Sequence, residues 1–237
     1  MKTVILCGGR GTRLGALGDE LPKTLVPLRG KPCLQYIVEN YLRRGYREFV
    51  LCVGHRGEMI VDFCQRQSWD AMFEWSDAGA GASMLERLHA ARALMGERAW
   101  VAYGDTLVDV DLASMLADHL AANAGITLTT AQVRSPFGLV EVDDEGWLRS
   151  FREKPVQPYF VGHMLVERGV LDVLAADLLR KPDGQGLVAL IQQLMASRRV
   201  RTHAYAGPQI TFNTPQDLDR AERDLIEFFT QTDRTPL

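Results

Sequence analysis

Leu6-Cys7-Gly8-Gly9-Arg10-Gly11-Thr12-Arg13-Leu14 follows directly on a short apolar run that begins at Val4. An apolar run that stops at glycine is typical of a buried parallel strand. The closely spaced glycines allow the backbone to approach an anion and to aim its N–H groups at it. Arg13 adds a bidentate phosphate donor. The stretch therefore predicts a strand followed by a phosphate-binding loop.

Two other glycine motifs do not fit this stretch. A dinucleotide-binding fingerprint would need glycine in place of Leu14, and Pro22-Lys23-Thr24 lacks the glycine that precedes lysine in a P-loop. A simple turn after a buried strand would explain one or two of the glycines. It would not explain Arg13 and the second basic segment that follows at close range, so we prefer the phosphate-loop interpretation.

Strand and helix signals alternate along the first half of the chain. Apolar runs typical of strands lie at 4–7, 49–54, 71–75 and 100–103, and apolar residues recur at helical spacing over 34–42, 59–63 and 84–94. This alternation predicts an α/β, Rossmann-like, mainly parallel sheet flanked by helices. Ligands of such sheets bind outside the carboxyl ends of the strands. Two loops at those ends stand out, 8–23 and 104–111.

The second half has a different character, with more strand signals than helical ones. Strands are predicted at 126–133, 139–142 and 147–151, with a hairpin turn at 143–146, and helices near 170–179, at 187–197 and from Thr214-Pro215 onward. We find no low-complexity linker and no internal repeat. The sequence predicts a single domain over 1–237, with a nucleotide-binding half at 1–123 and a β-rich acceptor half at 124–237.

Composition limits the kind of partner. The chain has 237 residues, 46% of them hydrophobic, and a formal net charge of −3. A mildly acidic chain of this size gives no electrostatic reason to expect nucleic acid or an anionic membrane as a partner. Phosphate chemistry must therefore depend on a few basic residues that are focused locally.

The cysteines and the N-terminus bear on the compartment. Cys7, Cys33, Cys52 and Cys64 form no C-x-x-C pair, and three of them lie in apolar stretches, where a free thiol behaves as a small hydrophobe. This favours a reducing compartment. The first apolar run is too short for a signal peptide, and no run is long enough to span a bilayer. We expect a cytoplasmic protein.

The second basic segment, Leu21 to Pro32, contains Pro22-Lys23 and Gly30-Lys31-Pro32. Together with residues 6–14 it resembles the sugar-1-phosphate nucleotidyltransferase family, whose opening pattern is L-x-G-G-x-G-T-R-L, then P-K, then G-K-P. The resemblance implies a Rossmann-like fold, Mg²⁺ as cofactor, and a nucleoside triphosphate and a sugar 1-phosphate as substrates. It also implies a nucleotide-binding set made of Leu6, Gly8, Gly9, Gly11, Thr12, Arg13, Lys23, Gly79 and Gly104.

The same resemblance implies the catalytic residues Arg13, Lys23 and Asp105. Arg13 and Lys23 would neutralise the triphosphate, with Lys23 near the α-phosphate. Asp105 follows the fourth predicted strand in Tyr103-Gly104-Asp105, where a carboxylate is well placed to hold Mg²⁺. It could also merely cap a turn. The attacking phosphate is already ionised, so the reaction needs no general base.

A second metal ligand is less clear from the sequence. The family often has an aspartate just before its T-P pair, whereas this chain has Asn213 before Thr214-Pro215. Asn213 could supply a carbonyl oxygen to the metal, or it could simply precede a helix cap. We therefore expect a metal site formed by Asp105 and Asn213. The missing acid also leaves open a nucleotide-binding regulator that has lost catalysis.

The acceptor half carries two further segments that resemble the family. Phe137 to Asp143 matches F/Y-G-x-x-x-x-D, and residues 151–155 contain Glu153-Lys154-Pro155. The resemblance implies that Gly138 lets backbone approach the sugar, that Glu153 bonds its hydroxyls and that Lys154 binds its phosphate. It also places Gly162 beside the sugar. The neighbouring histidine at 163 is either a sugar contact or a structural residue.

The resemblance extends from Val4 to about Leu218 and is nearest to the glucose-1-phosphate cytidylyltransferase branch. Residues 53–57 and 103–105 match that branch. Where the branch has T-G-G-R-L near the base, this chain has Met84-Leu85-Glu86-Arg87-Leu88, which leaves the base open. We expect CTP, with guanylyl, uridylyl or thymidylyl transfer to a sugar or heptose 1-phosphate as alternatives. The Glu-Lys-Pro segment argues against the molybdenum-cofactor type. The sequence leaves the oligomeric state open, a homo-oligomer included.

Overall fold

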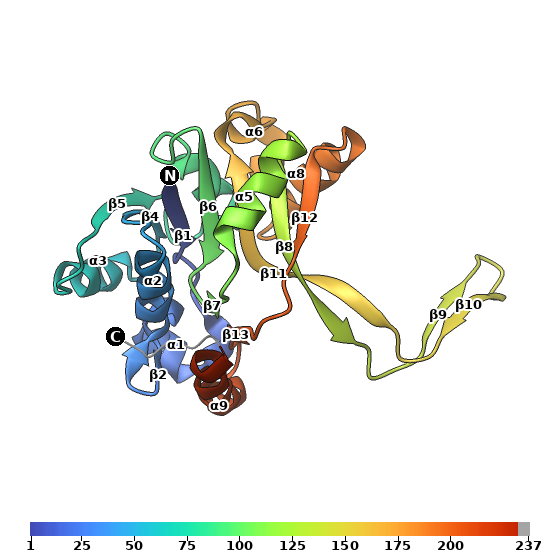
Figure 1. Cartoon of the computed structure of the whole chain (residues 1–237), viewed down its shortest axis with the longest axis horizontal. Helices are drawn as coiled ribbons and strands as arrows, with labels where there is room; N and C mark the ends of the chain where they lie inside the picture. The colour runs from blue at the N-terminus through green and yellow to red at the C-terminus, as the bar shows by residue number, and fades with distance from the viewer. Residues whose placement is uncertain (232–237) are drawn as a thin grey trace.

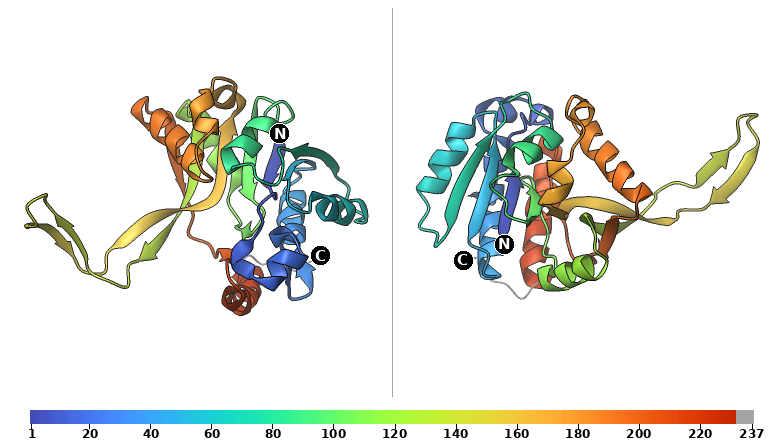
Figure 2. Two further views of the ribbon diagram at one scale, coloured as in Figure 1. Left: turned by 180° about the vertical axis from the view of Figure 1, so that it is seen from behind. Right: turned by 90° about the horizontal axis from the view of Figure 1, so that it is seen from above.

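The computed structural model describes residues 1–231 and is built around one seven-stranded sheet, with helices on both of its faces (Figures 1 and 2). The strand order is β12-β8-β11-β6-β1-β4-β5. The first half supplies four strands that run parallel, namely β1 (Lys2–Leu6), β4 (Glu48–Val53), β5 (Met72–Asp77) and β6 (Arg98–Tyr103). The predicted mainly parallel α/β sheet is confirmed.

The second half extends the same sheet on the β6 side. Its strands are β8 (Ile126–Arg134), β11 (Val156–Glu167) and β12 (Val200–Ala204). β11 runs antiparallel to both β6 and β8, and β12 is parallel to β8. The sequence analysis missed β11 and β12. Pro158, Gly162 and His163 interrupt the apolar pattern of β11, and the β11–β8 register shifts between Phe160 and Met164 at that point.

The helices of the first half lie close to where the sequence predicts them. They are α2 (Cys33–Arg43), α3 (Gly57–Gln65), α4 (Met84–Ala91) and α5 (Leu112–Ala121). A capping box starts α4, because Glu86 N donates to Ser83 Oγ at 3.3 Å and Ser83 N donates to Glu86 Oε2 at 2.7 Å. Asp111 caps α5, since its Oδ1 accepts from Ser114 N at 3.0 Å.

The remaining elements are shorter, except for the last two helices. The stretch near 170–179, predicted as helical, consists of two short helices, α6 (Arg168–Asp172) and α7 (Ala176–Leu179). The others are 3₁₀ turns at Thr12–Leu14 and Lys23–Leu25, α1 (Ala16–Glu20), β2 (Pro27–Leu28), β3 (Lys31–Pro32), β7 (Thr106–Leu107), α8 (Gln185–Ala196), β13 (Ile210–Thr211) and α9 (Pro215–Gln231). Over residues 1–231, none of these helices combines the length and apolarity that a bilayer span requires.

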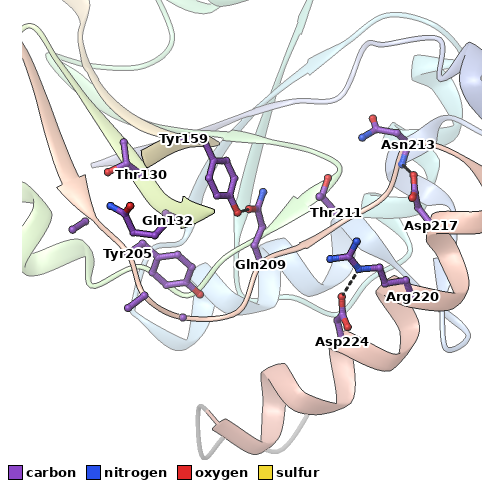
Figure 3. A pocket seen from close by; sticks show the side chains of 14 residues that line it. Thr130, Gln132, Tyr159, Tyr205, Gln209, Thr211, Asn213, Asp217, Arg220 and Asp224 are labelled. Atoms are coloured by element: carbon purple, nitrogen blue, oxygen red, sulfur yellow. Dashed lines mark hydrogen bonds and ion pairs between the residues drawn. The ribbon is translucent and has the colours of Figure 1, made fainter. Parts of the chain in front are cut away.

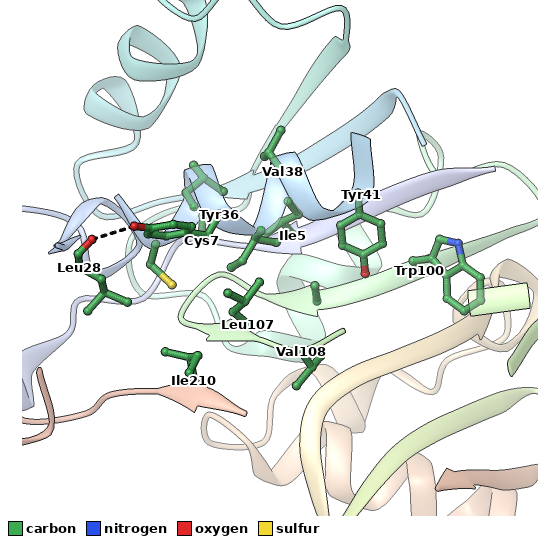
Figure 4. Packing of buried hydrophobic residues seen from close by; sticks show 14 of the residues in the cluster. Ile5, Cys7, Leu28, Tyr36, Val38, Tyr41, Trp100, Leu107, Val108 and Ile210 are labelled. Atoms are coloured by element: carbon green, nitrogen blue, oxygen red, sulfur yellow. Dashed lines mark hydrogen bonds between the residues drawn. The ribbon is translucent and has the colours of Figure 1, made fainter. Parts of the chain in front are cut away.

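Two apolar cores cover the two faces of the sheet. Successive residues of β1 alternate between them, with Ile5 in one and Val4 in the other, because side chains along a strand point to opposite faces. Figure 4 shows the first core, where Tyr36 and Tyr41 of α2 pack with Leu107 of β7 and Ile210 of β13. This packing holds the loop after β13 beside the N-terminal half.

One segment leaves the body of the molecule. β9 (Leu139–Val142) and β10 (Leu148–Arg152) form the predicted hairpin, joined to the sheet by the far ends of β8 and β11. Both figures of the whole chain show it projecting into solvent (Figures 1 and 2). We call residues 133–157 the arm. The hairpin does not fold back onto the sheet.

Candidate active site

A cleft of about 760 Å³ lies at the carboxyl ends of β1 and β6. Most of the predicted nucleotide and metal residues line it, and so does Gly162 of the predicted acceptor set. The nucleotide and metal residues are Leu6, Gly8, Gly9, Gly11, Thr12, Arg13, Lys23, Asp105 and Asn213. Gly79 lies just before the lining segment Ala80 to Ala82. Gly104 lies behind the cleft, where its N–H donates to the Leu6 carbonyl at 3.0 Å. The fold thus gathers residues from both halves of the chain at the edge that the strand order predicts.

The glycine loop has little room for side chains at two positions. A Cβ at Gly8 would lie 2.1 Å from Arg87 Nη1 and 2.8 Å from the Val53 carbonyl oxygen. Gly11 adopts a φ of 62°, in the left-handed region that favours glycine. Arg10 and Arg13 are exposed beside the loop. A backbone loop flanked by two free guanidinium groups is suited to a polyphosphate.

Lys23 lies at the centre of the polar contacts in the cleft. Its Nζ donates to Asp105 Oδ2 at 2.5 Å and to Asn213 Oδ1 at 3.0 Å, and it lies over the Phe212 ring. Thr106 Oγ1 donates to the other carboxylate oxygen of Asp105 at 3.1 Å. The two predicted metal ligands therefore converge on one cation, which in this structure is the lysine ammonium.

Asn213 takes part in the helix cap, one of the two roles that the sequence left open, and its role as a metal ligand stays a prediction. Its backbone N–H and that of Thr214 donate to Asp217 Oδ2, each at 2.9 Å, at the start of α9. These hydrogen bonds lower the pKa of Asp217. The Asn213 side chain meanwhile points its carbonyl oxygen at Lys23. The helix cap therefore holds the amide in the cleft.

The donors at this point suit a magnesium ion. Carboxylate and amide oxygens are hard ligands, and Mg²⁺ commonly takes one or two protein oxygens together with waters and substrate phosphates. Asp105 and Asn213 supply two such oxygens that already face a positive charge. Among residues 1–231, no group of three or more His, Cys, Asp or Glu side chains is placed to hold a metal ion. A metal held by Asp105 and Asn213 would therefore take its other ligands from water and a phosphate substrate.

The sequence analysis missed Arg87 as a cleft residue. It is 4% exposed, and its guanidinium donates to the carbonyls of Val53 (2.7 Å) and Ala80 (3.3 Å). Within the described part of the chain it forms no ion pair with an acid. It thus ties the loop after β5 to β4 and adds positive charge behind Gly8. One feature of the sequence could have indicated it, namely that Arg87 lies within the apolar stripe of a predicted helix.

Further residues line the cleft. Arg10, Tyr103, Thr106 and the segment Ala80 to Ala82 lie in or beside the predicted loops, whereas Met84, Phe160, Val161, Asp183, Gln209 and Thr211 were missed, because only the folded chain brings them there. A second pocket of about 690 Å³ adjoins the cleft and shares Gln209, Thr211 and Asn213 with it (Figure 3). In this pocket Tyr159 Oη donates to Gln209 Oε1 at 2.7 Å.

The predicted acceptor residues are not brought together as expected. Gly162 lines the cleft with a φ of 80°, and a Cβ there would lie 2.8 Å from the Tyr103 ring. Gly138, Glu153 and Lys154 instead lie on the arm, and none of them lines the cleft of its own chain. The physical reason is that β8 and β11 continue beyond the sheet as a paired ribbon and carry the hairpin outward.

His163 is a structural residue. Its side chain is buried between the Tyr41 hydroxyl, 2.7 Å from Nε2, and the Thr129 hydroxyl, 3.0 Å from Nδ1. Burial lowers the pKa of His163 to about 3, so the ring is neutral at physiological pH. Of the two alternatives that the sequence allowed, the sugar contact is excluded by this position in the core.

Comparison with known proteins agrees with this geometry. The model of the nucleotidyl transferase family matches residues 2–200. A Bacillus subtilis (strain 168) protein named "Probable glucose-1-phosphate cytidylyltransferase" is 29% identical over 75% of this chain and 79% of its own. The D-glycero-alpha-D-manno-heptose 1-phosphate guanylyltransferase of Campylobacter jejuni is 30% identical over 65% and 69%.

The fold has solved counterparts as well. A Bacillus anthracis structure, provisionally named a glucose-1-phosphate thymidylyltransferase, superposes with a TM-score of 0.74 at 19% identity, covering 94% of both chains. The predicted resemblance to the family and to its cytidylyltransferase branch is thus confirmed. The chain belongs to the nucleotidyl transferase family.

Proposed function

We propose that this protein transfers a nucleotidyl group from a nucleoside triphosphate to a sugar 1-phosphate and releases pyrophosphate. The observation that carries the proposal is the convergence of Asp105 and Asn213 on Lys23 beside the glycine loop. The names of the matched relatives support it, since they describe transfer to a sugar or heptose 1-phosphate.

The triphosphate would lie along the glycine loop. Backbone N–H groups of residues 8–12 would bind its oxygens, and Arg10 and Arg13 are free at the surface of the cleft to pair with it. The buried guanidinium of Arg87 would add a fixed positive charge behind the loop. Such preorganised charge acts without reorganisation as the reaction proceeds.

Lys23 would exchange partners when the substrates bind. Asp105 and Asn213 would hold Mg²⁺, which when bound neutralises phosphate charge and assists departure of pyrophosphate. Lys23, now held by these same two oxygens, would turn its ammonium toward the α-phosphate. The acceptor phosphate is already ionised, so positioning and charge stabilisation suffice and no covalent intermediate is required.

We propose CTP as the nucleoside triphosphate, so that the base to be recognised is cytosine. The loop after β5 is short of side chains at Gly79 to Ala82, so backbone groups would read the base edge. The Bacillus and Salmonella cytidylyltransferases among the relatives support a pyrimidine. The Campylobacter guanylyltransferase is the main alternative. Unpaired buried polar groups would then reject the wrong base.

Pyrophosphate release tests the proposal. Each of CTP, UTP, dTTP, GTP and ATP is paired with a panel of sugar 1-phosphates, with Mg²⁺ and with EDTA. We expect Mg²⁺-dependent release that is fastest with CTP. A tenfold preference for GTP would overturn the choice of base and leave the reaction standing. Nucleotide binding without release from any pair would overturn the reaction and favour a regulator.

A further inference from the structure

We propose that the arm docks on a second copy of this chain and places Glu153 and Lys154 at the partner's cleft. The site for the acceptor phosphate would then be completed between two chains. The inference rests on the proposed function for its substrate, but the docking of the arm is a separate property that can be measured without any turnover.

The first observation is an uncovered apolar face on the hairpin. Register pairs Val142 with Leu148 and Val140 with Phe151, and paired residues of an antiparallel ladder lie on the same face. All four side chains are exposed, as are Phe137 (73%) and Trp147 (70%) beside them. A two-stranded hairpin is marginally stable in water, and a patch of this kind is typical of an interaction surface.

The second observation is that the acceptor side of the cleft has no cation. The lining residues from the second half are Phe160, Val161, Gly162, Asp183, Gln209, Thr211 and Asn213, and none of them is basic. The cations of the cleft, Arg10, Arg13, Lys23 and Arg87, all come from the glycine-loop side, where the triphosphate would lie. Lys181 and Arg220 of the second half line the two adjoining pockets and lie outside this lining, so the arm is a further source of positive charge for a second anionic substrate.

The arm carries an exposed cation, Lys154, on a backbone turn with a defined conformation. Lys154 is exposed and has a φ of 43°, which non-glycine residues rarely adopt. Its neighbours hold this turn, because Ser135 N donates to the Pro155 carbonyl at 2.9 Å. Gly138 lies against Glu153, and a Cβ there would be 3.0 Å from Oε2. The three residues thus form one small surface on the arm.

The arm cannot bring this surface to its own cleft without losing structure. β8 and β11 are paired from Ile126↔Val166 to Arg134↔Val156, and folding back would break the outer pairs. β8 ends at Arg134 and β9 begins only at Leu139, so the hairpin lies beyond the last β8–β11 pair and outside the sheet (Figure 1). A two-fold symmetric dimer would instead lay each arm on the other chain.

The receiving surface is already present on each copy. The pocket in Figure 3 opens beside the root of the arm, between Tyr159 and α9, and leads into the cleft through Gln209, Thr211 and Asn213. Every copy therefore has both an arm with an uncovered apolar face and a groove that ends at an incomplete acceptor site. This is the self-complementary arrangement that a closed dimer requires.

Oligomeric state is the first test, and it does not depend on activity. By sedimentation the wild-type chain should be a dimer, and the double variant Val140→Ser/Phe151→Ser should be a monomer. Val173→Ser is the matched control, since Val173 is an exposed apolar residue of the body, 81% accessible, and should leave the dimer intact. A monomeric wild type, or a dimer that survives the double variant, would overturn the proposal.

Subunit mixing tests whether the arm serves the partner. Asp105→Asn removes function from the cleft, and Glu153→Ala/Lys154→Ala removes it from the arm. Mixed dimers, purified with two different tags and assayed below the acceptor KM, should regain about half of the wild-type rate, because one of their two sites is intact. If each arm served its own chain, the mixed dimer would stay near the mean of its parents.

Two results separate this inference from the proposed function. If the wild-type chain releases no pyrophosphate with any pair of nucleoside triphosphate and sugar 1-phosphate, the proposed function fails. The oligomeric state measured by sedimentation still tests the docking of the arm. Lys181 lies in a pocket next to the cleft and is the competing cation of the same chain. If Lys181→Ala raises the acceptor KM and Lys154→Ala does not, the arm does not complete the site.

Discussion

Lys23, Asp105 and Asn213 are far apart in the sequence, yet Asp105 Oδ2 and Asn213 Oδ1 each lie within 3.0 Å of Lys23 Nζ. Gly138 and Glu153 also meet, but on an arm that the sheet holds away from the cleft. The cleft is formed by the order of strands in a packed sheet, whereas the arm is formed by local pairing alone. A sequence motif can therefore bring residues together locally without fixing where the fold places them relative to the cleft.

The largest effect is expected at the centre of the cleft. If Asp105 holds Mg²⁺ as we propose, Asp105→Asn should lower pyrophosphate release on the order of 10³-fold or more, because it removes the anionic ligand with little change in volume. Circular dichroism should show an unchanged fold. Asp111→Asn is the matched control, since asparagine caps a helix as well as aspartate does. Near-normal release from Asp105→Asn would show that Asp105 does not hold the metal.

The next largest loss of activity is expected from substitution of the basic residues of the cleft. Arg13→Ala and Lys23→Ala should each lower kcat/KM about 10²-fold, a loss of a few kcal/mol of transition-state stabilisation. Lys2→Ala, which removes a lysine paired with Glu74 at the surface, should leave the kinetics unchanged. Unchanged kinetics for both Arg13→Ala and Lys23→Ala would contradict the proposal that these residues bind the phosphates. It would also weaken the distinction between the cleft and the arm.

His163 marks the point where β11 passes from the arm into the core. Its pKa is about 3 in the folded chain and about 6.5 when unfolded, so the unfolded chain binds the proton first. Its contribution to stability is complete above pH 6.5 and declines as pH falls toward 3, by about 2 kcal/mol at pH 5. Urea unfolding at pH 7 and pH 5 should show this loss in the wild type and less of it in His163→Gln. Equal losses in the two proteins would contradict the buried, neutral ring.

The smallest effect is expected on the arm. Lys154→Ala should raise KM for the sugar phosphate about tenfold and leave KM for the triphosphate unchanged, as for a contact to one substrate only. Arg149→Ala, which removes a cation paired with Asp143 on the same hairpin, is the control and should change neither value. An equal rise in both KM values would contradict the prediction that Lys154 contacts only the sugar phosphate.

Much of the fold is predictable because apolar periodicity is strong in its elements. The strands at β1, β4 and β6 are continuous apolar runs, and Ser83 and Asp111 signal the helices that they cap. β11 is different, since its outer half lies in solvent and its inner half begins at a bulge with Gly162. No single period describes such a strand, so the sequence pattern could not reveal it.

The candidate site was likewise only partly predictable from the sequence. The glycine loop and Asp105 were predictable because they follow strands whose carboxyl ends lie at one edge of the sheet, whereas Lys23 was implied by the family resemblance. Arg87 was not predictable, because an arginine that hydrogen-bonds backbone carbonyls leaves no acidic partner in the sequence to reveal it. The position of Glu153 and Lys154 was not either, because hairpin signals fix local pairing and not the direction in which the hairpin points.

The bulge between Phe160 and Met164 separates two registers along one strand. In the core, a slip of one residue would turn every side chain to the wrong face of the sheet. In the hairpin, β9 and β10 pair only with each other, so insertions or deletions near Gly146 leave the core register untouched. The tip of the arm can therefore change in length without turning a single side chain of the seven-stranded sheet to the wrong face.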